Sequence, residues 1–124
     1  MIFLHKGEVL ALHARAIEEH GGSPEIRDEG ALESALVAVQ NRFHYEDADA
    51  IGCAAAYAYH LTKAHAFLDG NKRVAAVATE IFLHINGVEV RATEKQLLKL
   101  YMGIADSSLN RDDVEARLRT LVRK

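Results

Sequence analysis

Apolar residues recur at helical spacing along almost the whole chain, and this periodicity is the strongest constraint on the fold. The segment from about Ala48 to Ala64 is rich in alanine and hydrophobic nearly all round, which is typical of a helix enclosed by other helices. Only the stretch from Val88 to Ala92 favours an extended conformation, and it is too isolated to found a sheet. The sequence therefore predicts an all-α fold around one central helix.

Capping residues and glycines predict where the other helices begin and end. Gly21-Gly22 should end the first helix, Asp28 can cap the second, and Thr93 with Gln96 forms a capping-box pattern. Ser108 or Asn110 can cap the last helix. About six helices are expected, over residues 6–20, 28–40, 48–64, 71–86, 93–104 and 110–122. Residues 42–49 are interpreted as a connection anchored by aromatic side chains.

Bulk properties limit the classes of protein to which the chain can belong. At 124 residues it should form a single domain, residues 1–124, with a core that needs no metal or disulfide. Cys53 is the only cysteine and lies in an apolar segment, so we expect a buried, inert thiol. The net charge of −3 argues against direct nucleic-acid binding. The basic tail, Arg117, Arg119, Arg123 and Lys124, most simply complements a helix dipole.

The N-terminal residues lack the pattern of a signal peptide, and no apolar stretch reaches the roughly 20 residues of a membrane span. We therefore expect a cytoplasmic protein without a membrane partner. His13 and His20 lie seven residues apart on one helical face, where a surface or half-buried structural role is expected for both in preference to metal binding.

Chemically active residues are densest between two helices, in the nine-residue sequence His65-Ala66-Phe67-Leu68-Asp69-Gly70-Asn71-Lys72-Arg73. A histidine can take a proton from a hydroxyl, and an aspartate can hold Mg²⁺. Lys72 and Arg73 are unfavourable near a helix N-terminus unless an anion is bound there. Phe67 is expected in the core, which would present His65 outward. These residues indicate phosphoryl or nucleotidyl transfer, although the chain has no P-loop and no G-x-G-x-x-G sequence.

A second arrangement remains open on the residues alone. A metal-dependent hydrolase could use His60, His65, Asp69 and His84 as ligands from facing helices. The five-residue separation of His60 and His65 is awkward for one helical face, and no ligand spacing is diagnostic.

The nine residues resemble the Fic motif, H-P-F-x-[DE]-G-N-[GK]-R, and in particular its Doc (death-on-curing) branch, in which lysine follows the asparagine. The resemblance covers nearly the whole chain. The other matching segments are Gly21-Gly22-Ser23-Pro24, Ile26-Arg27-Asp28, Leu32-Glu33-Ser34-Ala35-Leu36, Gln40-Asn41-Arg42-Phe43, Phe82-Leu83 and Asn86-Gly87-Val88.

This resemblance implies a compact, single-domain Fic fold and the toxin half of a toxin–antitoxin pair. Members of the Doc branch use ATP and Mg²⁺ to phosphorylate a hydroxyl of a translation factor, elongation factor Tu, and so stop protein synthesis. By the same resemblance, His65 would be the general base and Asp69 the Mg²⁺ ligand. The phosphate site would be lined by Gly70, Asn71, Lys72 and Arg73.

Three positions depart from the family pattern. Ala66 replaces proline, which is expected to loosen the loop, and Val74 replaces threonine. Ala76 stands where adenylylating relatives carry a second arginine, which favours a kinase over the alternative of an adenylyltransferase. A catalytically inactive antitoxin-binding module is the other alternative. The chain lacks the inhibitory [ST]-x-x-x-E-[GN] motif, so inhibition is expected from a Phd-like antitoxin that folds into a groove as a helix.

Overall fold

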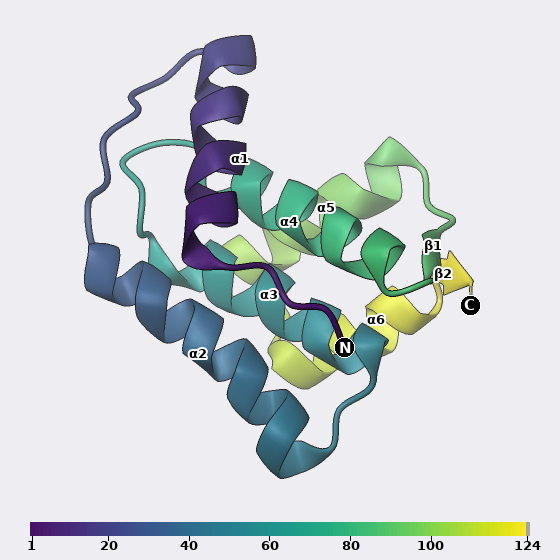
Figure 1. Cartoon of the computed structure of the whole chain (residues 1–124). Helices are drawn as coiled ribbons and strands as arrows, with labels where there is room; N and C mark the ends of the chain where they lie inside the picture. Colours follow the sequence, from purple (N-terminus) through teal and green to yellow (C-terminus); the bar gives the residue numbers. More distant parts are fainter. Residues whose placement is uncertain (124) are drawn as a thin grey trace.

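The predicted all-α architecture is confirmed by a computed structural model, which describes residues 1–123 (Figure 1). Six helices form within this range, with one small antiparallel sheet of two strands. The helices are α1 (Lys6–His20), α2 (Glu29–Glu46), α3 (Ala50–Ala64), α4 (Asn71–Ile85), α5 (Glu94–Ala105) and α6 (Arg111–Arg119), and the strands are β1 (Glu89–Val90) and β2 (Val122–Arg123). Lys124, part of the predicted basic tail, lies outside the described residues.

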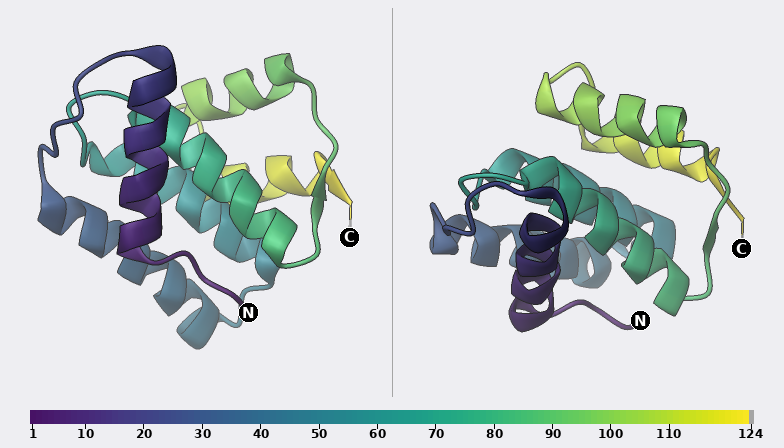
Figure 2. Two further views of the ribbon diagram at one scale, coloured as in Figure 1. Left: turned by 45° about the horizontal axis from the view of Figure 1, so that its top comes forward. Right: turned by 90° about the horizontal axis from the view of Figure 1, so that it is seen from above.

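Helix α3 is the centre of the fold, as its apolar composition predicts. Every residue from Ile51 to Ala58 is buried, and α3 contacts α2, α4, α5 and α6. Seen from above, α5 lies on one side of α4 and α1 on the other (Figure 2). Cys53 is fully buried as expected, and burial raises the pKa of its thiol to about 11.

The predicted caps are confirmed at three helices. A carboxylate oxygen of Asp28 accepts the N–H of Ala31 at the start of α2. Thr93 and Gln96 form the reciprocal capping box of α5, and Asn110, not Ser108, caps α6. These bonds join residues three apart, so local sequence is enough to predict them.

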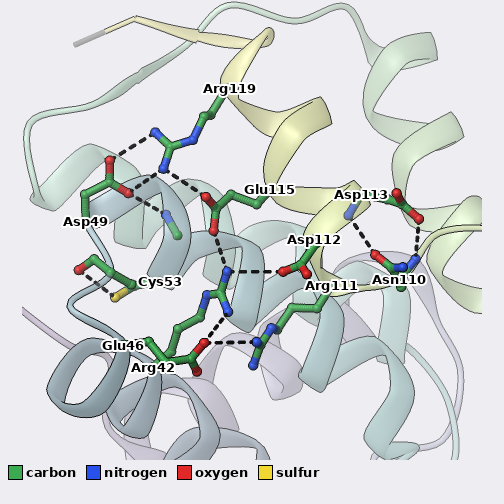
Figure 3. A network of polar contacts seen from close by, with 12 residues as sticks. Arg42, Glu46, Asp49, Cys53, Asn110, Arg111, Asp112, Asp113, Glu115 and Arg119 are labelled. Carbon is green, nitrogen blue, oxygen red and sulfur yellow. Dashed lines mark hydrogen bonds and ion pairs between the residues drawn. The ribbon is translucent and has the colours of Figure 1, made fainter.

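The predicted end of α2 at residue 40 is wrong, because the helix continues to Glu46 through most of the expected connection. Arg42 explains the extension. Its side chain is only 8% exposed, and it pairs with Glu46 at 3.3 Å and with Glu115 of α6 at 2.5 Å (Figure 3). A partner from a distant helix thus stabilises residues whose local pattern is mixed and polar.

The same ion-pair network joins α6 to the start of α3. Arg119 binds Asp49 at 3.0 Å and Glu115 at 3.0 Å (Figure 3). Although burial alone would raise the pKa of Glu115, hydrogen bonds from the two arginines hold it below its ordinary value. The network therefore connects α2, α3 and α6 through charged groups.

The predicted extension of the last helix to residue 122 is also wrong. Helix α6 ends at Arg119, and Val122 pairs with Val90 in the antiparallel sheet. The prediction that residues 88–92 are too isolated to form a sheet is wrong as well, because the chain end returns beside them and β1 pairs with β2. Within residues 1–123 no helix combines the length and apolar character needed to cross a membrane.

Candidate functional site

The candidate site is built around the loop of residues 65–70, which connects α3 to α4. His65 caps the end of α3 in the left-handed conformation, with φ 47°, and its side chain is exposed. Phe67 is 1% exposed, which confirms its predicted place in the core, whereas Asp69 is exposed. Phe67 therefore anchors the loop in the core, while the polar side chains of His65 and Asp69 lie at the surface.

The connection between α1 and α2 holds this loop along its backbone. Ile26 and Phe67 form an antiparallel bridge. The carbonyl of Ala66 accepts the N–H groups of Arg27 and Asp28 at 2.8 and 3.0 Å. Ala66 is itself 1% exposed, so an alanine in place of proline is packed and its carbonyl is fully used. Figure 2 shows the two connections side by side.

Asn71 ties the loop to the first turn of α4. Its side-chain oxygen accepts the N–H of Phe67 at 3.1 Å, and its side-chain nitrogen donates to the carbonyl of Phe67 at 2.8 Å. Both polar ends of the amide are therefore used within the loop. Asn71 lines the expected phosphate site, but its side-chain amide is used to hold the backbone of Phe67 in place.

Asp69 is held by the turn that follows α1. One carboxylate oxygen, Oδ2, accepts the N–H of Ser23 at 2.8 Å. Gly22 has a φ of +110°, and a Cβ at that position would lie 3.2 Å from the Cβ of Asp69. Glycine is therefore required at position 22 for its conformation and for the close approach of the aspartate.

His13 of α1 supports the same loop from inside the protein. Its ring is 2% exposed and stacks on Phe67, with centroids 3.7 Å apart and planes within 10°. Nε2 lies 2.8 Å from the carbonyl oxygen of Asp69. The structural role expected for this histidine is confirmed, but its expected surface or half-buried position is wrong, because the ring is buried. Its contact with the loop has no local signal in the sequence, since the two residues are 56 positions apart.

A pocket of about 420 Å³ opens at the start of α4. Its lining residues are Gly70, Asn71, Lys72, Arg73, Ala76, Leu97, Leu98 and Tyr101. Helix α4 contributes the two cations of this lining, Lys72 and Arg73, and α5 contributes apolar side chains. The sequence did not indicate that α5 contributes, because its capping box locates the helix but not the surface against which it packs.

The first turn of α4 has the properties of an anion site. Side chains cap α2, α3, α5 and α6, whereas Gly70 provides no side-chain cap for α4. Lys72 and Arg73 are exposed, and neither forms an ion pair with a side chain in residues 1–123. Free amides, the positive end of the helix dipole and two cations therefore meet at one end of the pocket.

A second hollow of about 300 Å³ lies between α1 and α4, and we call it the α1–α4 groove. It is lined by Leu12, Arg15, Ala16, Glu19, His20, Arg73, Val77 and Ile81. Arg73 lines both the pocket and this groove, so a molecule bound in the groove can reach a cation of the pocket.

The predicted site residues are thus brought together only in part. Gly70 to Arg73 line one pocket, whereas His65 and Asp69 do not belong to its lining. In the described part of the chain, no three His, Cys, Asp or Glu side chains gather closely enough to hold a metal ion. The four proposed ligands of a hydrolase, His60, His65, Asp69 and His84, therefore do not form a metal centre, and that alternative is wrong.

A single carboxylate still suits Mg²⁺ if a nucleotide completes its coordination, because this ion is commonly bound through one or two carboxylates and substrate phosphates. Asp69 fits this requirement. Its Oδ2 is fixed by Ser23, and its Oδ1 accepts no hydrogen bond from residues 1–123. The adjacent cationic pocket fits the phosphates and the apolar wall fits a base or ribose.

Comparisons of the sequence with known proteins identify a family and two relatives. The model of the Fic/DOC family matches residues 3–83. The chain is 35% identical over 115 residues to the protein kinase doc of Escherichia phage P1, covering 92% of this chain and 90% of that protein. It is 38% identical over 92 residues to the toxin Doc of Mycolicibacterium smegmatis, covering 73% of this chain and 68% of that protein.

Proposed function

We propose that this chain, which belongs to the Fic/DOC family and is of the Doc type, is a toxin that transfers the γ-phosphate of ATP to a hydroxyl of a translation factor. Elongation factor Tu is the proposed acceptor. The observation that carries the proposal is the pocket at the uncapped start of α4, which joins a cationic end to an apolar wall. A nucleoside triphosphate has the complementary distribution of charge.

In the proposed reaction His65 is the general base. It takes the proton of the acceptor hydroxyl as that oxygen bonds to the γ-phosphorus, and the bond from phosphorus to the bridging oxygen of ADP breaks. Exposure at the end of α3 makes His65 accessible to a protein substrate. Its place one residue before the buried Ala66-Phe67 anchor gives it a defined position.

The remaining residues bind and orient the nucleotide. Asp69 would hold Mg²⁺, which neutralises charge on the phosphates. Lys72, Arg73 and the first amides of α4 would bind the phosphate oxygens directly. Asn71 bonds the backbone of Phe67 and so fixes the loop relative to the first turn of α4, which carries Lys72 and Arg73.

Two lining residues favour phosphate transfer over adenylyl transfer. Lys72 occupies space in the anion site where adenylylating relatives have glycine, and Ala76 supplies no second cation. With a cation at position 72 and none at position 76, the pocket binds the three phosphates in a different arrangement, which we propose presents the γ-phosphate to the acceptor.

The α1–α4 groove is the proposed binding site of a Phd-like antitoxin. Four of its eight lining residues, Leu12, Ala16, Val77 and Ile81, are apolar and suit one face of a helix. Arg73 at its edge suits an acidic residue of that helix. An antitoxin bound there would compete with phosphate for Arg73 and block the kinase.

Labelled ATP tests the proposed reaction. The protein is incubated with purified elongation factor Tu, or with a cell lysate, and with ATP labelled at either the γ or the α position. Label transferred only from the γ position, and lost in His65→Ala, supports the kinase. Transfer from the α position would establish an adenylyltransferase instead. An inactive binding module is supported if neither label is transferred and the toxin fails to arrest growth when expressed without antitoxin.

A further inference from the structure

Two contacts join the buried imidazole of His13 to the loop of the candidate site, and we propose that His13 is a positioning residue for Asp69 and the first turn of α4. The ring stacks on Phe67 and bonds the carbonyl of Asp69 at 2.8 Å. It also lies close to the backbone of Gly70, since a Cβ added there would be 3.6 Å from the ring. This inference rests on the proposed function for the chemical role of the loop.

The hydrogen bond explains why a histidine occupies this place in the core. An apolar ring would fill the same space and stack on Phe67 without the cost of burying polar nitrogens. A carbonyl can only accept, so Nε2 of His13 carries the hydrogen and donates it to Asp69. This donor is what histidine adds to the packing.

Asp69 is consequently held at two points, one on helix α1 and one in the turn that follows α1. His13 of α1 holds its carbonyl, and the N–H of Ser23, just after α1, holds its carboxylate. With both ends restrained, the free carboxylate oxygen keeps one direction relative to the backbone. Gly70, the next residue, is the N-cap of α4 and lies close to the His13 ring. The contacts of His13 therefore also position the first backbone amides of α4, which lie at the pocket.

Loss of the donor should release the peptide that joins Asp69 to Gly70. The carboxylate and the first amides of α4 would then sample several orientations, and small displacements of such groups weaken binding and transfer. The fold should survive because the stacked ring can be retained. His65 is attached through the separately bonded Ala66, so its role as base should be less affected.

Two substitutions of His13 remove the hydrogen-bond donor to Asp69, and a third keeps a donor. His13→Phe keeps an aromatic ring against Phe67 without a donor, and His13→Leu serves the same purpose if the first variant does not fold. His13→Gln retains a donor nitrogen near the place of Nε2. Val9→Ala is the matched control, since Val9 is fully buried one turn earlier on α1 and makes no hydrogen bond to the loop.

Two measurements report on position without relying on turnover. Hydrogen exchange of residues 66–71 reports on the order of the loop, and calorimetry with MgADP reports on its binding. We expect the donor-free variants to exchange faster there and to bind MgADP about tenfold more weakly. The donor-free variants should also need more Mg²⁺ for half-maximal transfer. His13→Gln should recover part of each loss. Val9→Ala should show none of these changes, even where its Tm falls as far as that of the donor-free variants.

The inference is overturned if donor-free variants keep wild-type exchange and wild-type affinity for MgADP, or if Val9→Ala reproduces their changes. A wild-type protein that neither binds MgADP nor transfers label would instead refute the proposed function. In that case hydrogen exchange alone still decides whether His13 positions the loop.

Discussion

The side-chain amide of Asn71 bonds both backbone polar groups of Phe67, at 3.1 and 2.8 Å. These two bonds fix the start of α4 relative to the loop before it. They therefore also fix the position of the groups in the first turn of α4 that are proposed to bind phosphate. The residue therefore contributes to the site by holding the backbone.

Asn71→Ala should destabilise the protein and loosen the loop. Two hydrogen bonds in a partly buried place are lost, which costs about 1–3 kcal/mol of unfolding free energy. Urea denaturation measures this change. Asn41→Ala, at an exposed position of α2, is the control and should stay within about 0.5 kcal/mol of wild type. Equal losses of unfolding free energy in Asn71→Ala and Asn41→Ala would show that the bonds from Asn71 to Phe67 do not stabilise the loop.

Asp69→Asn should remove Mg²⁺-dependent transfer while leaving the fold intact. The amide oxygen can still accept the N–H of Ser23, so stability should change by no more than about 0.5 kcal/mol. The negative charge that attracts Mg²⁺ is lost. A titration of Mg²⁺ at fixed ATP measures the effect, and turnover that matches wild type throughout would exclude Asp69 as a ligand.

Lys72→Gly should lower γ-phosphate transfer by about 100-fold, the usual loss when one charge-stabilising group is removed. Adding Ala76→Arg restores a cation on the same pocket wall at a different position. We expect the double variant to transfer label from α-labelled ATP more than either single variant does. If its label still comes only from the γ position, Lys72 and Ala76 do not determine which group is transferred.

Val77→Glu should weaken antitoxin binding by tenfold or more, roughly the effect of one unfavourable charge in an interface. Val77 lines the α1–α4 groove, where a carboxylate would repel an acidic helix. Calorimetry with the cognate antitoxin measures the change. Val37→Glu, on the exposed face of α2, should bind normally. Unchanged binding by Val77→Glu would place the antitoxin elsewhere.

Glu115→Gln should reduce stability at neutral pH by about 1–3 kcal/mol, because two arginines lose a charged acceptor. A carboxyl with a lowered folded pKa stabilises the protein above its unfolded pKa, and this contribution disappears as the pH falls through the folded value. The difference between wild type and variant should therefore shrink below about pH 4.5. Urea denaturation from pH 7 to 3 measures it, with the exposed Glu18→Gln as control. A difference independent of pH would contradict the charged pairing.

Much of the fold could be predicted because its signals are local. The caps of α2, α5 and α6 join residues three apart, and the apolar character of α3 already indicates its central place. The end of α2 could not be predicted in this way, because Arg42 is stabilised by Glu115, 73 residues later. The strand pair β1–β2 likewise depends on where the chain end returns.

For the site, the sequence alone predicts which residues would carry the chemistry, since the motif from His65 to Arg73 is contiguous and each residue type has a limited set of reactions. Only the tertiary structure decided how they are held. His13 and Ser23 meet Asp69 across 56 and 46 residues, and α5 closes the pocket. Such contacts follow from the packing of α1 and α5 against α4, and periodicity identifies the apolar face of a helix but not its neighbour.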